Sequence, residues 1–283
     1  MYAAEISRNN PAMILFLLDQ SGSMQELFDP EDIQLATDTI TKAQALADAI
    51  NKLLQNLVIK CSKEDGIRDY FHIGVIGYGS QVGPALSGSL AGRDLVPISE
   101  VGATPARMEI RKKKVSDGAG GLVDVDLRFP IWFEATSSGG TPMCACLQEA
   151  HRIAQDWING HPNCFPPIVI NITDGESTDG DPSNPGAALR GLASTDGPVL
   201  LFNLHLSGKK ARAIEFPNSE AGLFDRYSKV LYQISSQLTP FMVNVANQQG
   251  FNASEGARGF VFNAKLEVAI QFLDIGTRAS NLR

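Results

Sequence analysis

Three short stretches of this 283-residue sequence carry oxygen-bearing side chains whose types and spacing suit the binding of a hard cation. The first stretch, Asp19-Gln-Ser21-Gly22-Ser23, follows an apolar run and places one carboxylate and two hydroxyls at alternate positions. A glycine between the two serines lets the backbone turn tightly, so both hydroxyls can point to one centre. Oxygen ligands suit Mg²⁺ or Mn²⁺, and the lack of His and Cys in this stretch disfavours zinc.

Two later stretches have the same character. The segment Ser137-Ser-Gly-Gly-Thr141 precedes Pro142, which predicts a helix with the threonine hydroxyl at its entrance. Asp174 ends a second apolar run and is followed by Gly175. Singly, each signal is weak, because a threonine before a helix is often a cap and Asp-Gly is often a turn. Their joint occurrence in this chain order, each at a predicted strand-to-helix switch, is much more specific.

The loop after Asp174 is acidic as well, since it carries Glu176, Thr178, Asp179 and Asp181. We expect most of these side chains to be solvated turn residues. Ligation of the cation through water by one of them is the alternative.

The elements that must position these stretches follow from the hydrophobic pattern. Apolar runs of strand length alternate with longer segments of helical period, which is typical of a parallel sheet covered by helices. The predicted strands are 13–18, 70–78, 166–172, 198–206 and a short edge strand at 259–262. The predicted helices are 34–60, 142–157, 187–193, 222–238 and 264–275. We expect a doubly wound α/β fold with a mostly parallel sheet and helices on both faces, whose carboxyl edge carries all three stretches.

One region interrupts this alternation. Residues 79–138 contain no convincing helical period, and their apolar residues alternate, which predicts an inserted β-hairpin or small sheet over 84–135. The basic run Arg111-Lys-Lys-Lys114 lies within the insertion; such a run is most often a solvated edge, and contact with an acidic partner or a phosphate is the alternative. No internal repeat and no long linker divides the chain, so we expect a single domain over 1–283.

Aromatic residues near the end of the insertion have two interpretations. Phe129, Trp132 and Phe133 could anchor a partner protein, as large aromatic side chains do at interfaces. They could equally form the core of the hairpin itself.

Composition excludes several classes of function. A formal net charge of −7 argues against nucleic-acid binding, which needs clustered Lys and Arg. The first residues do not read as an export signal, and no apolar run approaches the roughly 18 residues that span a membrane. Four cysteines fit a reducing compartment, so we expect a cytoplasmic protein without a membrane partner. Cys144 and Cys146 could hold a soft metal, but no second Cys or His pair follows at a ligand spacing.

The three stretches together resemble the metal-ion-dependent adhesion site of von Willebrand factor type A (VWA) domains. The residues that carry the resemblance are, in chain order, Asp19, Ser21, Ser23, Thr141 and Asp174. All five motif positions are matched, the resemblance covers most of the chain, and the inserted segment departs from a minimal domain. The resemblance implies that these residues hold one Mg²⁺ directly or through water, and that the protein is a binding module. It is similar in particular to bacterial stand-alone intracellular members, which are associated with tellurite-resistance loci or encoded near kinases, metal-dependent phosphatases or AAA-type ATPases.

We therefore expect no enzyme but a Mg²⁺-dependent adaptor or scaffold, acting in a bacterial signalling or stress-response system. Mg²⁺ prefers six oxygen ligands, so a carboxylate or phosphate of a partner protein could complete the coordination. One alternative is a metal-dependent phosphohydrolase, although such sites usually carry more than two carboxylates. Another is an assembly factor that binds through the inserted hairpin. The sequence contains no nucleophile elbow, phosphate-binding loop or dinucleotide fingerprint.

Overall fold

The computed structural model describes residues 2–27, 40–116, 121–206 and 213–264, and also residues 268, 271, 272, 274 and 275. The strands of its central sheet are β1 (Ala12–Asp19), β4 (Phe71–Tyr78), β5 (Val82–Pro84), β6 (Val96–Pro97), β9 (Ile168–Thr173), β12 (Leu200–Leu206), β13 (Ile214–Glu215) and β14 (Phe260–Ala264). They lie in the order β13-β14-β12-β9-β1-β4-β5, and β6 also pairs with β4. The pairs among β14, β12, β9, β1 and β4 are parallel, whereas β13, β5 and β6 pair antiparallel.

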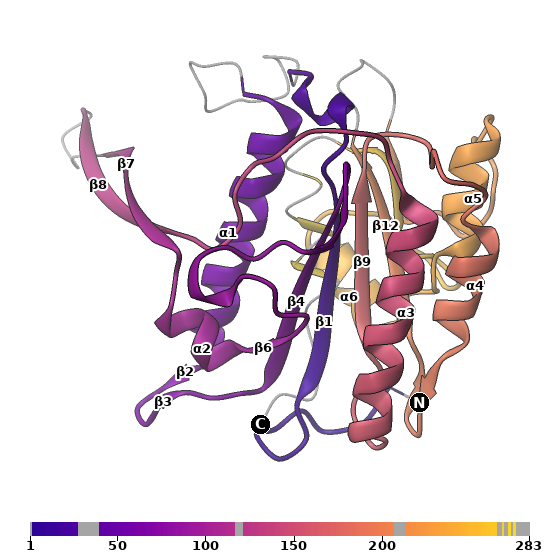
Figure 1. Ribbon diagram of the computed structural model, residues 1–283, viewed down its shortest axis with the longest axis horizontal. Helices are drawn as coiled ribbons and strands as arrows, with labels where there is room; N and C mark the ends of the chain where they lie inside the picture. The colour runs from indigo at the N-terminus through magenta and orange to yellow at the C-terminus, as the bar shows by residue number, and fades with distance from the viewer. Residues whose placement is uncertain are drawn as a thin grey trace.

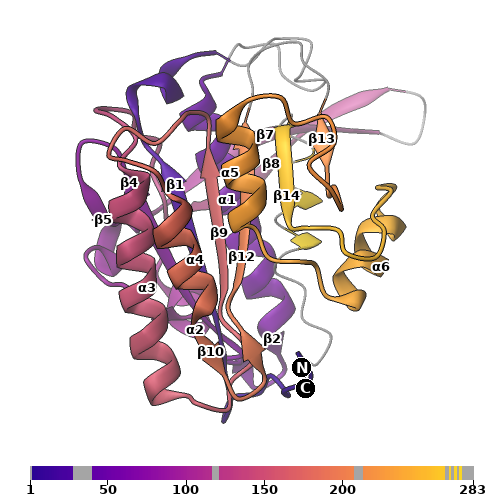
Figure 2. The same ribbon diagram turned by 90° about the vertical axis from the view of Figure 1, so that its right-hand side faces the viewer.

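Helices cover both faces of this sheet. They are α1 (Lys42–Cys61), α2 (Ile98–Ala103), α3 (Met143–Gly160), α4 (Ser183–Gly191), α5 (Arg226–Ile234) and α6 (Pro240–Gln248). Figure 1 shows α1 and α3 on opposite sides of the strands, and Figure 2 shows α3, α4 and α5 side by side across one face. The predicted doubly wound α/β fold, with its mostly parallel sheet, is therefore confirmed.

The first strand explains why the sheet must be covered twice. All eight residues of β1 are buried, and its side chains alternate between two hydrophobic cores. Ile14, Phe16 and Leu18 pack in the core that includes α1 and α6, whereas Met13 and Leu15 pack in the core of α3, α4 and α5. Full burial of each such side chain contributes roughly 1.5–3 kcal/mol. A continuous apolar run is the pattern that a strand buried on both faces requires.

The chain order creates a switch point at the carboxyl edge of the sheet. From β1 the chain passes through α1 to β4 on one side, and after β4 it passes through α3 to β9 on the other side of β1. Leu18 pairs with Ile172, so Asp19 and Thr173 stand at the adjacent ends of neighbouring strands. Open α/β sheets bind their ligands at this kind of position.

Several elements differ from the sequence expectations. Helix α2 lies within the region that was expected to lack helices; it buries Ile98 and Val101, and six residues are too few to show a helical period. The helix expected over 222–238 ends earlier, as α5, and α6 then begins at Pro240 behind the cap of Thr239. Strand β14 is not an edge strand, because the two-residue β13 pairs with its outer side.

Two helix starts also differ. Helix α1 begins at Lys42, where the Thr41 hydroxyl accepts a hydrogen bond from the backbone N–H of Gln44; positions 34–39 of the predicted helix lie outside the described residues. Pro142 is the N-cap of α3 rather than part of its first turn. For the predicted final helix, the described residues 268, 271, 272, 274 and 275 are helical.

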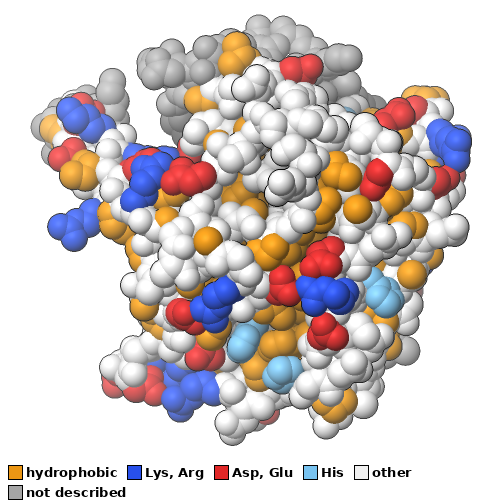
Figure 3. All heavy atoms as spheres, in the orientation of Figure 1, with side chains coloured by type: hydrophobic (Ala, Val, Ile, Leu, Met, Phe, Trp, Pro, Cys, Tyr) orange, Lys and Arg blue, Asp and Glu red, His pale blue; other side chains and the backbone are white. Residues whose placement is uncertain are grey.

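The predicted inserted hairpin is present. Strands β7 (Arg107–Ser116) and β8 (Leu122–Ile131) pair antiparallel along their whole length, and Figure 1 shows them projecting from the body. Two further short pairs, β2 (Ser62–Lys63) with β3 (Gly66–Ile67) and β10 (Ala193–Ser194) with β11 (Gly197–Pro198), close surface turns. On the face that Figure 3 shows, the hairpin carries hydrophobic, basic and acidic side chains together.

Trp132 and Phe133 do not anchor a partner, because each is only 2% exposed and packs in the α1 core. They follow β8, where the hairpin rejoins the body, and the Trp132 indole N–H donates to the carbonyl of Val101. Phe129 is half-buried beneath the guanidinium of Arg111, at 3.8 Å. The same Arg111 forms an ion pair with Asp48 of α1 at 2.8 Å, so part of the basic run braces the hairpin against the body.

Candidate metal centre

Asp19 ends β1 as a buried carboxylate, with 1% of the residue exposed. Its Oδ1 accepts the backbone N–H of Ser21 at 2.8 Å, and its Oδ2 accepts the hydroxyl of Thr173 at 2.7 Å. Burial raises the pKa of Asp19 above its ordinary value; the hydrogen bonds oppose this rise, and the charge of Asp174 adds to it. A nearby positive charge would stabilise the ionised form of a carboxylate that is buried in this way.

The next two hydroxyls link Asp19 to the second carboxylate. The turn that follows β1 forms a short 3₁₀ helix, Gly22–Gln25, and the hydroxyl oxygens of Ser21 and Ser23 lie 2.9 Å apart. The Ser23 hydroxyl donates to Oδ1 of Asp174 at 2.7 Å. Because the side chain of Asp174 has no exposed area, two buried carboxylates and two hydroxyls share this end of the sheet.

Thr141 joins them through a loop that is tied to the β1 turn. The carbonyl of Gly139 accepts the N–H of Gly22 at 3.0 Å, and Gly139 has a φ of +81° that favours glycine. A Cβ placed on Gly175 would stand 3.8 Å from Oγ1 of Thr141 and 3.9 Å from Oγ of Ser23, so these two hydroxyls flank one point. The structure thus brings all five predicted residues together, and we call them the oxygen cluster: Asp19, Ser21, Ser23, Thr141 and Asp174.

The donor set of the oxygen cluster suits Mg²⁺ or Mn²⁺. Within the described part of the chain, no group of three or more His, Cys, Asp or Glu side chains is placed to hold a metal ion. A cation here would therefore depend on the hydroxyls as well as on the two carboxylates, which is hard-ion chemistry. Cys146 is fully buried on α3, and burial raises the pKa of its thiol well above the ordinary value, which disfavours a thiolate ligand. The assignment of the oxygen cluster as a metal site stays a prediction.

Thr178 and Asp179 of the acidic loop are exposed, as expected, but both also make hydrogen bonds that tie the loop to the start of α3. The hydroxyl of Thr178 accepts the backbone N–H of Thr141 at 2.9 Å. The carboxylate of Asp179 accepts the N–H groups of Cys144 and Ala145, at 3.0 and 2.9 Å, and so caps the start of α3. These contacts fix the backbone on either side of Pro142 and so position Thr141 of the oxygen cluster. They join residues more than 30 positions apart, so no local sequence pattern predicts them.

Sequence reasoning also missed Lys42. Its ammonium donates to Oδ2 of Asp174 at 2.9 Å and to Oε2 of Glu26 at 2.7 Å, and its side chain is 5% exposed. A lysine in the first turn of a helix opposes the helix dipole, which is the one signal that the sequence offers.

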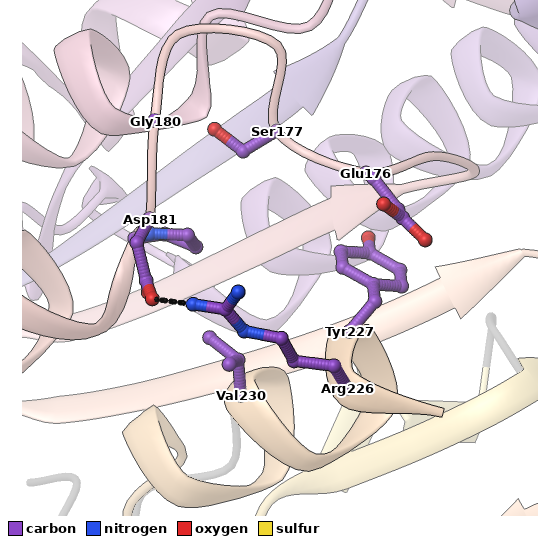
Figure 4. A pocket seen from close by; sticks show the side chains of 8 residues that line it. Glu176, Ser177, Gly180, Asp181, Arg226, Tyr227 and Val230 are labelled. Carbon is purple, nitrogen blue, oxygen red and sulfur yellow. Dashed lines mark hydrogen bonds and ion pairs between the residues drawn. The ribbon is translucent and has the colours of Figure 1, made fainter. Parts of the chain in front are cut away.

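A pocket of about 320 Å³ adjoins the end of β9 (Figure 4). Arg226 reaches across it to Asp181, with the two groups 2.7 Å apart, and the Tyr227 hydroxyl lies 3.5 Å from Oγ1 of Thr173. The pocket is lined by Glu176, Ser177, Gly180, Asp181, Pro182, Arg226, Tyr227 and Val230.

No helix among the described residues combines the length and the apolar character that a membrane crossing needs.

Comparisons with known proteins add little to this description. No protein-family model matches the sequence, and no curated protein does. Among solved structures, the chain is similar to the three N-terminal domains of the type V pili tip protein Mfa5 from Porphyromonas gingivalis, at 12% identity and a TM-score of 0.31 over 59% of this chain and 20% of that chain. The vWF domain of the same protein gives 12% identity and a TM-score of 0.31 over 59% of this chain and 39% of that chain. Similarity at this level says nothing about function. The function is therefore inferred from the oxygen cluster.

Proposed function

We propose that this protein is a Mg²⁺-dependent interaction module in which the oxygen cluster holds the ion and a partner's carboxylate or phosphate completes its coordination. The observation that carries the proposal is the convergence of two buried carboxylates and three hydroxyls at the switch point of the sheet. Burial of carboxylates is unfavourable without positive charge; Lys42 supplies one positive charge for the two buried carboxylates, and a divalent cation would supply the rest.

The chemistry of the donors supports an acidic partner. Two carboxylates offset the two charges of Mg²⁺, whereas the hydroxyls are neutral donors and leave the ion able to attract another anion. The net charge of −7 does not prevent this, because a bound ion dominates the field at its own site.

Binding is favoured over catalysis by the number of carboxylates. Both oxygens of Asp19 and both oxygens of Asp174 accept hydrogen bonds, from Ser21, Thr173, Ser23 and Lys42, and each oxygen keeps a lone pair that could ligate a metal ion. A carboxylate that ligates the ion is a poor base for water, so hydrolysis would require a further acidic residue, and the oxygen cluster contains only these two carboxylates. If the protein hydrolyses an aryl phosphate in the presence of Mg²⁺, and Asp174→Ala abolishes this activity, the protein is a phosphohydrolase and the proposal is wrong.

The setting is proposed from the motif resemblance alone. The chain's resemblance to bacterial stand-alone VWA proteins favours a role in a cytoplasmic signalling or stress-response system. A kinase, a phosphatase or an AAA-type ATPase is then the kind of partner that we propose.

Metal binding is tested with the metal alone. Titration calorimetry should give one Mg²⁺ site in the wild-type chain and at least about a tenfold loss of affinity in Asp19→Asn, because a charged ligand is lost. Asp156→Asn is the matched control, since Asp156 is an exposed carboxylate on α3 that pairs with Arg152. A wild-type chain that binds neither Mg²⁺ nor Mn²⁺, or an Asp19→Asn chain that binds Mg²⁺ equally well, would overturn the proposal.

The anionic partner is tested with an immobilised poly-glutamate peptide as the probe. The wild-type chain should bind the surface in Mg²⁺ and should leave it in EDTA, when like charges repel. Asp19→Asn should not bind under either condition. Binding that survives EDTA would show that the metal does not make the contact.

Contact through the hairpin is the second candidate, and its exposed apolar side chains favour it. Ile110 is 73% exposed and Leu127 is 44% exposed. For any partner that co-purifies with the chain, Ile110→Ser with Leu127→Ser should abolish capture if the hairpin makes the contact. Asp19→Asn should abolish it if the metal does.

A further inference from the structure

Lys42 has surroundings that its position in the chain does not explain. It is the first residue of α1, where the helix dipole disfavours a cation, and yet its side chain is 95% buried. Its ammonium lies between Oδ2 of Asp174, at 2.9 Å, and Oε2 of Glu26, at 2.7 Å. Its backbone N–H also donates to the carbonyl of Glu26, at 2.9 Å. A lysine that breaks a local rule in this way is held by its tertiary contacts.

The two carboxylates that Lys42 contacts differ in their exposure. The side chain of Glu26 is 67% exposed, so water screens its charge. The side chain of Asp174 has no exposed area, so an uncompensated charge there would be strongly unfavourable. The ammonium of Lys42 donates to both carboxylates, and these two anionic partners favour its charged form although the side chain is buried. The pair of Lys42 with Asp174 is therefore the important one.

The oxygens of Asp174 are divided between two kinds of donor. Oδ1 accepts the hydroxyl of Ser23 within the oxygen cluster, and Oδ2 accepts the ammonium of Lys42 from outside it. Lys42 thus supplies positive charge to the same carboxylate that the proposed Mg²⁺ would use. Two cations that share one carboxylate repel each other, so each weakens the binding of the other.

We propose that Lys42 is a built-in counter-cation of the oxygen cluster, which neutralises Asp174 in the absence of metal and competes with a bound metal ion for that carboxylate. The stabilising part follows from the ion pair alone, and the competing part rests on the proposed function. With metal bound, the ammonium leaves the cluster with an excess of positive charge, which favours an anionic partner over a neutral one.

The stabilising part is tested in EDTA, with no metal present. Lys42→Met keeps the apolar stem and removes the charge, and the melting temperature should fall by about 5–8 °C, as expected when one partner of a buried ion pair is removed. Lys60→Met is the matched control: Lys60 lies on the same helix and pairs with Asp274, but 43% of its side chain is exposed, so its change should stay within about 2 °C. Lys42→Met combined with Asp174→Asn should recover most of the loss, because no buried charge is then left alone.

Failure of Lys42→Met to fold would agree with the proposal only if the double variant with Asp174→Asn folds. A double variant that also fails, or a Lys42→Met chain as stable in EDTA as the wild type, would overturn it.

The competing part is tested by titration with Mg²⁺ alone. Lys42→Met should bind Mg²⁺ about tenfold tighter than the wild-type chain, because a neighbouring positive charge is gone. Weaker or equal binding would overturn competition and would make Lys42 a support that positions Asp174. If neither the wild-type chain nor Lys42→Met binds Mg²⁺, the proposed function and the competition both fail. The measurements in EDTA still decide whether Lys42 is the counter-cation.

Discussion

A chain of buried polar side chains runs across three strands beneath the oxygen cluster. The Tyr78 hydroxyl donates to Oδ1 of Asn171 at 2.7 Å, Nδ2 of Asn171 donates to Oδ1 of Asn203 at 3.0 Å, and Nδ2 of Asn203 donates to Oγ of Ser235 at 2.9 Å. Both asparagines have no exposed area. We predict that Asn203→Leu destabilises the protein, because it breaks this chain at its centre.

The magnitude follows from the groups that the substitution leaves unpaired. Nδ2 of Asn171 would keep only the Met143 sulfur, at 3.9 Å. A buried polar group without a partner costs about 1–3 kcal/mol, and the lost bond to Ser235 adds about 1 kcal/mol. With an unfolding entropy of about 0.6 kcal/mol/K for 283 residues, the total of about 2–4 kcal/mol lowers the melting temperature by about 3–7 °C.

Thermal and urea unfolding, followed by circular dichroism, measure this loss. Asn159→Leu is the control, because Asn159 lies exposed on α3, and its stability should change by less than about 0.5 kcal/mol. The double variant Asn171→Leu with Asn203→Leu should cost less than the sum of the two single variants, because both amides are then absent. A single variant that unfolds like the wild type, or strict additivity in the double variant, would refute the reasoning.

Two further predictions concern pH and the loop of the oxygen cluster. Burial lowers the pKa of His205 to about 4, against about 6.5 in the unfolded chain. Because the unfolded chain then binds a proton at a higher pH than the folded chain, the folded state loses roughly 3 kcal/mol of stability as the pH falls from 6.5 towards 4. Urea unfolding of His205→Gln should therefore depend less on pH across this window than that of the wild type or of His151→Gln, and equal slopes would contradict the assignment. Gly139→Ala should cost about 1–3 kcal/mol in urea unfolding and should weaken Mg²⁺ binding, because φ is +81° and the new Cβ would lie 2.5 Å from the Ser80 nitrogen. Unchanged stability and calorimetric affinity would contradict the role of that loop.

The fold could be predicted because its main elements have local signatures. Strands that are buried on both faces read as continuous apolar runs, and the helices that cover them repeat every three or four residues. The same reading places Asp19 and Asp174 at the ends of two strands, and the parallel sheet then brings those ends to one edge. Helix α2 and strand β13 were not predicted, since two to six residues are too few for a period to show.

By itself, the sequence determined the five members of the oxygen cluster, the edge of the sheet at which they meet, and the inserted hairpin. Only the tertiary structure decided that Lys42 pairs with Asp174, that Asp179 caps α3 from across a loop, and that Trp132 lies in the core. The physical reason is the range of the interactions. Periodicity and strand ends are properties of neighbouring residues, whereas the partner of a buried charge is chosen by folding, from residues more than a hundred positions away in the case of Lys42.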